Sequence, residues 1–258
     1  MKIRKAVILA GGYGTRLMEE TEARPKPMVE IGGRPMLWHI MKMYAAHGVT
    51  DFVLPLGYKG HMIKQYFAEY HMHAADVCVD LAYNTVTTLK RTAEPWKVTL
   101  VDTGISTMTG GRIAQLREHI GDEPFYLTYG DGVAALDIRK LTEFHASHGC
   151  IATVTAVRPP SRYGSLDIEN GQVRTFNEKP LGGESWISGG FFVLSPRVFD
   201  YIDGESTVFE REPLEKLARD GQLMAFQHEE FWYSMDTLRD KKHLEELWAS
   251  KAAPWKVW

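Results

Sequence analysis

The sequence predicts an α/β fold in which helices flank a mixed, mostly parallel sheet. Apolar strand-like runs alternate with amphipathic helix-like runs over residues 5–70, which is the pattern of βαβα units. After residue 150 the pattern changes to short strand-like runs separated by turn residues, which indicates antiparallel strands added to the parallel core. No linker or repeat interrupts the chain, so residues 1–258 are interpreted as one domain, with a core over about residues 1–200 and a helical C-terminal extension over about residues 201–258.

The first half of the chain supplies parallel strands and the helices that cover them. Residues 5–10 form a continuous apolar run typical of a buried parallel strand. Residues 35–48 predict a helix that begins at a proline and ends at a glycine, and residues 59–70 predict a second helix. Residues 51–58 predict a strand between these helices, and Pro55 indicates that this strand ends there or lies at an edge.

The rest of the chain adds one more parallel strand and then the antiparallel group. The run "FYLTYGDG" predicts a buried strand that ends in an acidic turn, and a helix follows that Asp137 caps and Gly149 stops. Asn170 and Gly171 form a strong hairpin signal. The remaining predicted elements are strands within residues 150–157, 164–179 and 186–195 and helices within residues 208–221 and 237–250.

Composition and charge exclude several classes of protein. Apolar residues make up 44% of the 258 residues and the net charge is -3, which is ordinary for a globular domain and argues against a general nucleic-acid binder. No run approaches the ~20 apolar residues of a membrane span, and the apolar run of residues 6–10 is too short for a secretory signal. We therefore expect a cytoplasmic protein with no membrane or nucleic-acid partner. Cys78 and Cys150 lack metal-ligand or redox spacing, so both are expected to be reduced core thiols.

Residues 9–16, "LAGGYGTR", place three glycines directly after the first predicted strand. Backbone N–H groups can cradle phosphate oxygens only where no side chain blocks the approach, and Gly11, Gly12 and Gly14 leave that opening. A P-loop would continue with Lys and Ser or Thr, and a dinucleotide-binding loop would have a third glycine where Leu17 stands, so neither motif fits. On the glycines alone, a plain strand-to-helix turn and an anion-binding loop stay equally open.

Two cations beside this loop favour the anion-binding interpretation. Arg16 closes the loop, and Lys26 stands in "RPKPM", where prolines restrict the backbone on both sides. The stretch "ILAGGYGTRLMEETEARPKPMVEIGGRPML" resembles the sugar-1-phosphate nucleotidylyltransferases, whose pattern is a glycine-rich loop ending in Gly-Thr-Arg-Leu and then Pro-Lys-Pro-Met. This resemblance implies a Rossmann-like, GT-A-like nucleotidyltransferase core, with Arg16 and Lys26 as catalytic residues on the triphosphate.

Later segments resemble, within this family, the cytidylyltransferases that act on glucose 1-phosphate. The segments are "LWHIMKMY", "EPWKVTLVDTG", "MTGGR", "TYGDGVA", "EKP", "GGFFVL", "MDTLRD" and "APWKVW", so the resemblance covers nearly the whole chain. The choice of CTP rests on the resemblance, which implies that residues 106–112 and the backbone of residues 9–12 recognise the base. Thr109 also suits the N-cap of a helix at "TGG", and a helix N-terminus is itself an anion site. The nucleotide-binding residues implied in this way are Leu9, Ala10, Gly11, Gly12, Tyr13, Gly14, Thr15, Arg16, Lys26, Ser106, Thr109, Gly111, Arg112 and Asp131.

Asp131 and Asp236 are the metal ligands that the resemblance implies. Asp131 follows a buried strand in "YGDG", at the edge of the sheet where ligands bind, and its flanking glycines are expected to leave room for an ion. The alternative for Asp236, in "SMDT", is that it only caps the last helix. Mg²⁺ takes one or two carboxylates together with phosphate oxygens and waters, so Mg²⁺ is the expected cofactor.

The implied reaction transfers a cytidylyl group from CTP to a sugar 1-phosphate, with α-D-glucose 1-phosphate as the expected acceptor, and releases pyrophosphate. Because the attacking phosphate is already an anion, catalysis needs positioning and charge neutralisation and no general base. The sugar phosphate is expected at Glu178, Lys179, Ser188 and Gly189. Ser188 stands where the family has an asparagine, and this shorter side chain predicts a lost hydroxyl contact, a water bridge or a different sugar.

Two other functions stay open at this point. One is a uridylyl- or thymidylyltransferase acting on a related sugar 1-phosphate. The other is a non-catalytic regulatory protein that binds a nucleotide sugar, which would not need Arg16, Lys26, Asp131 and Asp236 together. The resemblance also implies a homo-oligomer, such as a hexamer, with residues 71–97 and the "APWKVW" terminus at interfaces, and a role in supplying precursors of surface polysaccharides.

Overall fold

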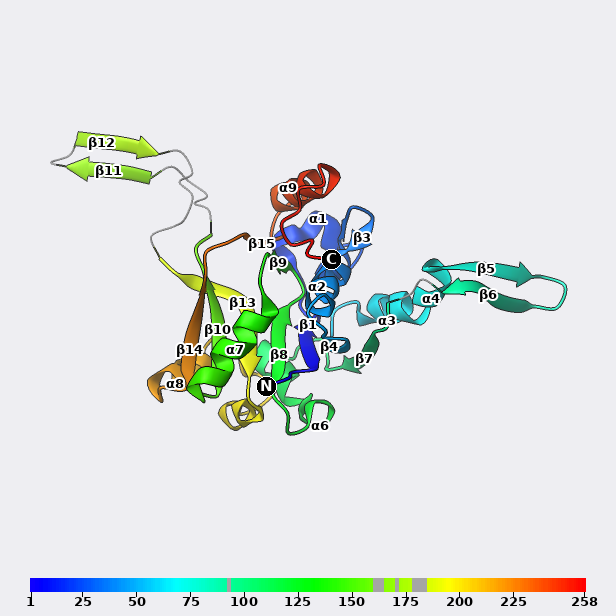
Figure 1. Cartoon of the computed structure of the whole chain (residues 1–258), viewed down its shortest axis with the longest axis horizontal. Helices are drawn as coiled ribbons and strands as arrows, with labels where there is room; N and C mark the ends of the chain where they lie inside the picture. Colours follow the sequence, from blue (N-terminus) through cyan, green and yellow to red (C-terminus); the bar gives the residue numbers. More distant parts are fainter. Residues whose placement is uncertain (92–93, 160–164, 170–171, 178–184) are drawn as a thin grey trace.

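A seven-stranded sheet forms the centre of the described part of the chain, in the order β14-β10-β13-β8-β1-β4-β7 (Figure 1). The structure is a computed structural model that describes residues 1–91, 94–159, 165–169, 172–177 and 185–258. The strands of this sheet are β1 (Lys5–Leu9), β4 (Asp51–Leu56), β7 (Lys97–Asp102), β8 (Phe125–Tyr129), β10 (Ala152–Val157), β13 (Ile187–Leu194) and β14 (Leu223–His228). Strands β8, β1, β4 and β7 are parallel neighbours, and β13 runs antiparallel between β8 and β10. The prediction of a mixed, mostly parallel sheet is confirmed.

Different helices cover the two faces of this sheet. The helices are α1 (Met18–Thr21), α2 (Met36–Ala45), α3 (Gly60–Ala68), α4 (Tyr70–His73), α5 (Thr109–Ala114), α6 (Arg117–Ile120), α7 (Ile138–His148), α8 (Glu212–Arg219) and α9 (Leu238–Ala249), with 3₁₀ turns η1 (Thr15–Leu17), η2 (Lys26–Met28) and η3 (Pro196–Tyr201). Side chains of β1 alternate, so Ala6 and Ile8 enter one apolar core and Val7 and Leu9 the other. Residues of α2, α7 and α9 complete the first core, and residues of α5, α6 and α8 complete the second.

The predicted signals for both ends of α7 hold, and of the two alternatives for Pro55 the end of the strand is the one observed. Asp137 caps α7 by accepting from the N–H groups of Arg139 and Lys140, and Gly149 ends it in the left-handed conformation with φ +68°. Pro55 is the last residue but one of β4, as its end signal indicated, but β4 pairs with strands on both sides and is no edge strand. A proline is tolerated there because the regular ladder finishes one residue later.

Separate two-stranded antiparallel sheets occur beside the central sheet. Among the described residues, β9 (Gly132–Ala134) pairs with β15 (Trp232–Ser234), and β2 (Glu30–Ile31) pairs with β3 (Arg34–Pro35). The predicted hairpin near residue 170 is present as β11 (Ser165–Glu169) paired with β12 (Gln172–Asn177), and its turn lies outside the described residues. A further hairpin, β5 (Ala75–Asp80) and β6 (Thr85–Arg91), extends away from the sheet (Figure 1).

The two cysteines are free thiols, as expected, but they are not core residues. Cys78 lies exposed on the β5–β6 hairpin, and Cys150 is partly buried at the end of α7. Apolar neighbours in the sequence suggested a core position, and the hairpin instead carries such residues away from the body of the protein. No helix among the described residues has both the length and the apolar character needed to cross a membrane.

Candidate active site

Two aspartates meet at the carboxyl end of the sheet because two short strands pair there. Asp131 directly precedes β9, and one residue, Met235, separates β15 from Asp236. Since β9 and β15 are antiparallel, with Ser234 opposite Gly132, the two carboxylates come to the same end of the pair. The N–H of Met235 donates to the carbonyl of Asp131 at 2.9 Å and fixes this approach.

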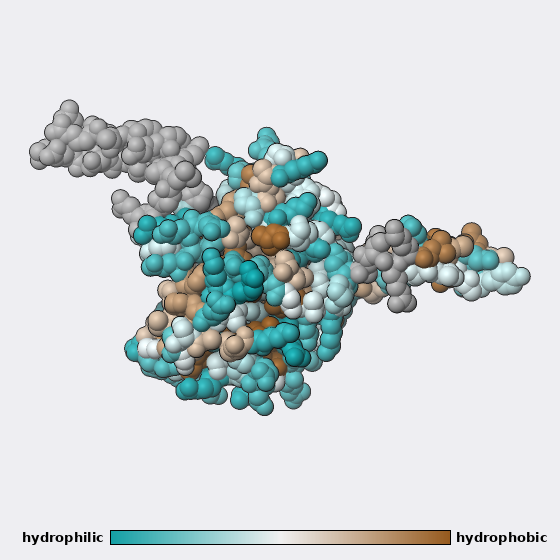
Figure 2. Space-filling view, in the orientation of Figure 1, coloured by the Kyte–Doolittle hydropathy of each residue, from teal (hydrophilic) through white to brown (hydrophobic). Residues whose placement is uncertain are grey.

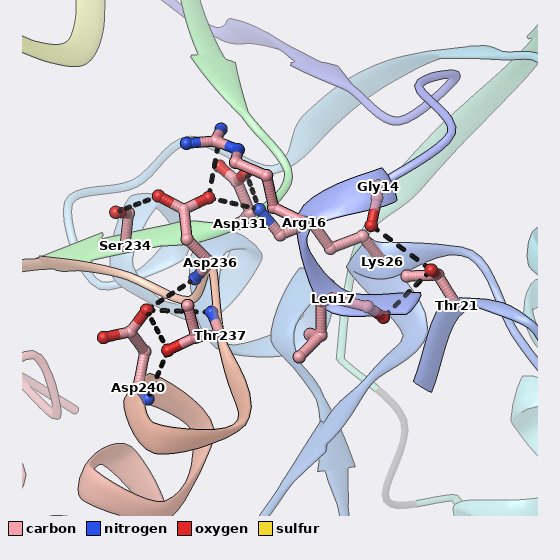
Figure 3. Close-up of polar contacts among 10 residues, drawn as sticks. All are labelled: Gly14, Arg16, Leu17, Thr21, Lys26, Asp131, Ser234, Asp236, Thr237 and Asp240. Carbon is pink, nitrogen blue, oxygen red and sulfur yellow. Dashed lines mark hydrogen bonds and ion pairs between the residues drawn. The ribbon is translucent and has the colours of Figure 1, made fainter. Parts of the chain in front are cut away.

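Lys26 bridges the two carboxylates (Figure 3). Its Nζ lies 2.7 Å from Oδ2 of Asp131 and 2.7 Å from Oδ1 of Asp236, and the lysine is only 6% exposed. Arg16 reaches the same Oδ1 of Asp236 through its Nη2 at 3.1 Å, although its side chain is 72% exposed. Arg16, Lys26, Asp131 and Asp236, which we call the charge cluster, thus bring together residues from four separate segments of the chain.

The charge cluster stabilises the ionised form of Asp236. Burial by itself would raise the pKa of this carboxyl group. The hydrogen bond and charge of Lys26, the charge of Arg16 and a hydrogen bond from Ser234 outweigh burial and lower the pKa. Asp236 is therefore an anion at neutral pH even though it is only 7% exposed.

The donor set of the charge cluster fits a hard divalent cation. Oxygen atoms of Asp131 and Asp236 already converge on one positive charge, the Lys26 ammonium, at distances typical of charge-assisted hydrogen bonds. No group of three or more His, Cys, Asp or Glu side chains gathers as a metal site within the described ranges. Two carboxylates with further oxygens from a ligand are what Mg²⁺ commonly uses, whereas Zn²⁺ sites usually have three or four protein ligands.

Of the two glycines beside Asp131, only Gly132 has the open space that we expected of both. A Cβ on Gly130 would lie 2.7 Å from Cγ of Pro27 and 2.9 Å from the carbonyl oxygen of Leu9, so Gly130 permits close packing. Gly132 has only the carbonyl oxygen of Tyr233, at 3.8 Å, near a Cβ position. Open space is therefore found at Gly132, and the expectation of room for an ion at Gly130 was wrong.

Asp236 does not cap the last helix. Thr237 is the N-cap of α9, and its hydroxyl accepts from the N–H of Asp240 while the Asp240 side chain accepts from the N–H of Thr237. Asp240 also accepts from the N–H of Asp236 at 3.0 Å. Because the capping box uses Thr237 and Asp240, the carboxylate of Asp236 is directed to the charge cluster.

The glycine loop presents unused backbone donors next to the charge cluster. The N–H groups of Gly12, Tyr13 and Gly14 donate to no acceptor among the described residues. A Cβ on Gly12 would have nothing within 4 Å, and Gly14 adopts φ +65° with its Cβ position 3.0 Å from Cβ of Lys26. Gly12 thus leaves the space that an anion needs, and Gly14 allows the loop to turn toward Lys26.

The remaining residues of the loop are fixed by backbone contacts or exposed. The Leu9 carbonyl accepts from the N–H of Gly130, and the N–H of Ala10 donates to the carbonyl of Pro55. Tyr13 is 49% exposed and its ring packs against Tyr58, and Thr15 is exposed at the start of η1.

The helix at "TGG" does not begin as we expected. Met108, not Thr109, occupies the N-cap position of α5, and no side chain caps it. The N–H groups of Gly110 and Gly111 donate to the carbonyl of Thr207, at 2.9 and 3.3 Å. These donors are therefore used within the protein, and the start of α5 is not a free anion site as we had expected. Ser106 lies exposed before this helix.

The residues predicted for the sugar are only partly within the described part of the chain. Glu178 and Lys179 lie outside it. Ser188 is exposed on β13, and the carbonyl of Gly189 accepts a hydrogen bond from Nε1 of Trp232 at 2.7 Å. Trp232 belongs to β15, so this bond connects β13 with the strand that leads to Asp236.

Comparisons with known proteins show the family to which this chain belongs. A family model described as nucleotidyl transferase matches residues 5–240. The chain belongs to the nucleotidyl transferase family. It is similar to a glucose-1-phosphate cytidylyltransferase of Salmonella typhi, with 58% identity over 98% of this chain and 99% of that protein. A probable glucose-1-phosphate cytidylyltransferase of Bacillus subtilis is 46% identical over 98% of this chain and 100% of that protein.

Solved structures of nucleotidyl transferases share the fold. The crystal structure of HddC from Yersinia pseudotuberculosis superposes with a TM-score of 0.70 and 27% identity, covering 95% of this chain and all of that one. The expected fold class is thereby confirmed.

Sequence reasoning missed several residues that shape this nucleotidyl transferase site. Ser234 and Asp240 orient Asp236, and Thr103 and Gly57 surround Arg112. The Thr237-x-x-Asp240 spacing resembles a capping box and could have shown that Thr237, not Asp236, is the N-cap of the last helix. No local signal marks Gly57 or Thr103, because their partners come from distant segments.

Proposed function

We propose that this protein transfers the cytidylyl group of CTP to α-D-glucose 1-phosphate, giving CDP-glucose and pyrophosphate. The observation that carries the reaction type is the charge cluster, in which Lys26 joins two strand-end aspartates beside a loop with free N–H donors. The names of the similar Salmonella and Bacillus proteins support CTP and glucose 1-phosphate as the substrates.

The mechanism follows from bringing two polyanions together. An oxygen of the sugar phosphate attacks the α-phosphorus of CTP, the new P–O bond forms, and the bond to the β-phosphate oxygen breaks. Lys26 neutralises the α- and sugar phosphates from its buried position, and Arg16, which is exposed, neutralises the pyrophosphate as it leaves. The free N–H groups of Gly12 to Gly14 hold phosphate oxygens.

Asp131 and Asp236 are the residues that would hold Mg²⁺ in this proposal. When bound, the ion supplies electrostatic stabilisation of the charge on the transferring phosphoryl group. Lys26 and Arg16 keep the carboxyl group of Asp236 ionised, which is the form that binds a metal ion.

The direct test is pyrophosphate release in the presence of Mg²⁺, with CTP, UTP and dTTP each paired with a panel of sugar 1-phosphates. We expect release to be fastest with CTP and glucose 1-phosphate. Faster release with UTP or dTTP would favour the alternative base, and no release with any pair would favour a nucleotide-sugar-binding regulatory protein.

Aspartate variants test the metal assignment. Asp131→Asn and Asp236→Asn each keep side-chain size and remove one charge, so each should lower kcat by about 100-fold or more, the scale of a lost charge-stabilising group. Asp122→Asn, at an exposed turn, is the matched control and should match the wild type. Normal turnover by both cluster variants would remove them as metal ligands.

We also propose that the chain acts as one catalytic unit in a homo-oligomer. The sheet takes β14 and the site takes β15 from residues after 200, which supports a C-terminal part that completes the site. Figure 2 shows apolar surface on the β5–β6 hairpin, where Val79, Leu81, Val86 and Leu89 are 55–87% exposed. Exposed apolar residues of this kind mark association surfaces.

Sedimentation measures the role of the hairpin. The double variant Val86→Glu, Leu89→Glu should sediment as a smaller species than the wild type, while Met224→Glu, a partly exposed apolar residue on β14, should not change the assembly. Equal sedimentation of both variants and the wild type would exclude the hairpin as an interface. A cytoplasmic location accompanies this proposal, because CTP and sugar phosphates are cytoplasmic metabolites.

A further inference from the structure

Arg112 is a buried cation whose guanidinium is held by oxygen atoms of three loops. It is 4% exposed, and its Nη1 donates to the carbonyl of Leu56 at 2.9 Å, to Oγ1 of Thr103 at 2.7 Å and to the carbonyl of Gly104 at 2.8 Å. Its Nη2 donates to the carbonyl of Gly11 at 3.1 Å and more weakly to that of Ile105. We call this set of contacts the arginine hub.

The arginine hub lies where three parallel strands end. Gly11 follows β1, Leu56 ends β4, and Thr103 follows β7, and these strands are neighbours in the sheet. The carboxyl ends of neighbouring parallel strands share one edge, which is where α/β sheets bind nucleotides. Arg112 therefore fixes the backbone of all three loops at the edge that carries the glycine loop.

Two glycines are needed for the guanidinium to occupy this place. A Cβ on Gly11 would overlap the guanidinium itself. A Cβ on Gly57 would lie 2.6 Å from the carbonyl oxygen of Gly11 and 2.7 Å from both terminal nitrogens of Arg112. A side chain at Gly11 would therefore clash with Arg112. A side chain at Gly57 would clash with both the carbonyl oxygen of Gly11 and Arg112.

The oxygen contacts of the hub set the direction of a backbone carbonyl. The Gly11 carbonyl accepts from Nη2 of Arg112 and also from the N–H of Tyr58 at 3.1 Å. Within the described residues, Arg112 has no carboxylate partner at ion-pair distance, so backbone and hydroxyl oxygens alone satisfy its donors. Loss of the guanidinium would leave the Gly11 carbonyl held by the Tyr58 N–H and would let this peptide group and the adjoining N–H groups change orientation.

We propose that Arg112 is a positioning residue for the nucleotide base, and that Gly57 determines base selectivity through it. Cytosine and uracil differ at two adjacent ring positions. Cytosine has an acceptor at N3 and an amino donor at C4, whereas uracil has an N–H donor at N3 and a carbonyl acceptor at C4. Backbone groups can distinguish the two only if the loops hold them in fixed directions, which the arginine hub does for the loops after β1, β4 and β7. This inference rests on the proposed function and adds the Leu56–Gly57 loop to the base site.

The first experiment compares two Gly→Ala variants in the complete protein. Gly57→Ala should raise KM for CTP by about tenfold and lower the preference for CTP over UTP by about tenfold, the scale of one hydrogen bond, with a much smaller effect on kcat. Gly204→Ala is the matched control, because a Cβ there has nothing within 4 Å and its φ is not positive, and it should behave as the wild type. Equal kinetics of Gly57→Ala and Gly204→Ala, or a fall in kcat alone, would overturn the proposal.

A second variant keeps the proposal testable if Gly57→Ala does not fold. Arg112→Ala leaves a cavity of guanidinium shape, so added methylguanidinium should restore CTP affinity and CTP preference, while methylammonium should not. Equal rescue by both cations, or rescue by neither in a variant that folds, would refute the proposed role of Arg112 in positioning the base. If the wild type releases no pyrophosphate with any nucleotide, the proposed function fails instead, and CTP and UTP binding by calorimetry then tests the hub separately.

Discussion

Replacing Lys26 with methionine removes the ammonium group that joins the two site carboxylates while keeping most of the side-chain volume. Lys26 contacts both Asp131 and Asp236 at 2.7 Å, so one substitution removes an ion-pair partner from each. The loss of one charge-stabilising donor typically costs ~2.7–4 kcal/mol of transition-state stabilisation, so kcat should fall by about 100- to 1000-fold. Steady-state pyrophosphate release at saturating substrates measures this effect.

The same substitution should strengthen the binding of a free divalent cation. In the free protein the Lys26 ammonium neutralises both carboxylates and repels an incoming cation. Two unit charges 4 Å apart interact by about 4 kcal/mol at an effective dielectric constant of 20, and only part of this is recovered because Arg16 stays beside Asp236. We therefore expect about tenfold tighter binding of Mn²⁺, followed by electron paramagnetic resonance in the absence of nucleotide.

Protein stability should change less than at a fully buried ion pair. Removing one partner of such a pair costs about 3–5 kcal/mol, but the Asp131 side chain is 26% exposed and Asp236 keeps Arg16, so we expect roughly 1–3 kcal/mol by urea unfolding. Lys42→Met, which removes a partly buried ion pair with Glu94, is the control and should leave kcat and Mn²⁺ affinity unchanged. A Lys26→Met protein with near-normal kcat, or with unaltered Mn²⁺ affinity, would refute this account of the charge cluster.

Other predictions concern the cap, buried histidines and the sugar pocket. Thr237→Ala should lower the unfolding free energy by about 1 kcal/mol through the lost capping box, and urea unfolding against the wild type measures this loss. Burial lowers the pKa of His39 and of His145 from 6.5 to about 4, so the folded state holds both imidazoles neutral. As pH falls from 6.5 toward 4, the unfolded chain binds protons at these histidines and the folded chain does not, so the free energy of unfolding should fall by at most roughly 3 kcal/mol per histidine. Equal urea midpoints at pH 7 and pH 4.5 would contradict this. Ser188→Asn should lower KM for glucose 1-phosphate about fivefold if the serine weakens the sugar pocket, and unchanged kinetics would dismiss that idea.

Local sequence signals predicted the helices and strands. The side-chain contacts of the site instead depend on residues that lie far apart in the sequence. Periodicity and capping residues placed α2, α7 and the strands, because each depends on neighbours a few residues away. The errors at Thr109 and at the cysteines share one cause. Thr109 suits an N-cap locally, but its hydroxyl accepts from the N–H of Phe209 and donates to Glu210, a hundred residues away. An apolar run around Cys78 suggested burial, and the hairpin exposes it.

The sequence, with its resemblance to a known family, determined the fold class and pointed to the four charged residues that meet in the charge cluster. The fold class follows from residue periodicity, Arg16 and Lys26 stand close to the glycine loop in the sequence, and the resemblance to the family adds Asp131 and Asp236. Only the tertiary structure decided that Lys26 joins Asp131 to Asp236, and that Gly11 is a glycine because of Arg112. The pairing of β9 with β15 and the common edge of β1, β4 and β7 create these contacts, because they bring together residues separated by about 50 to 210 positions.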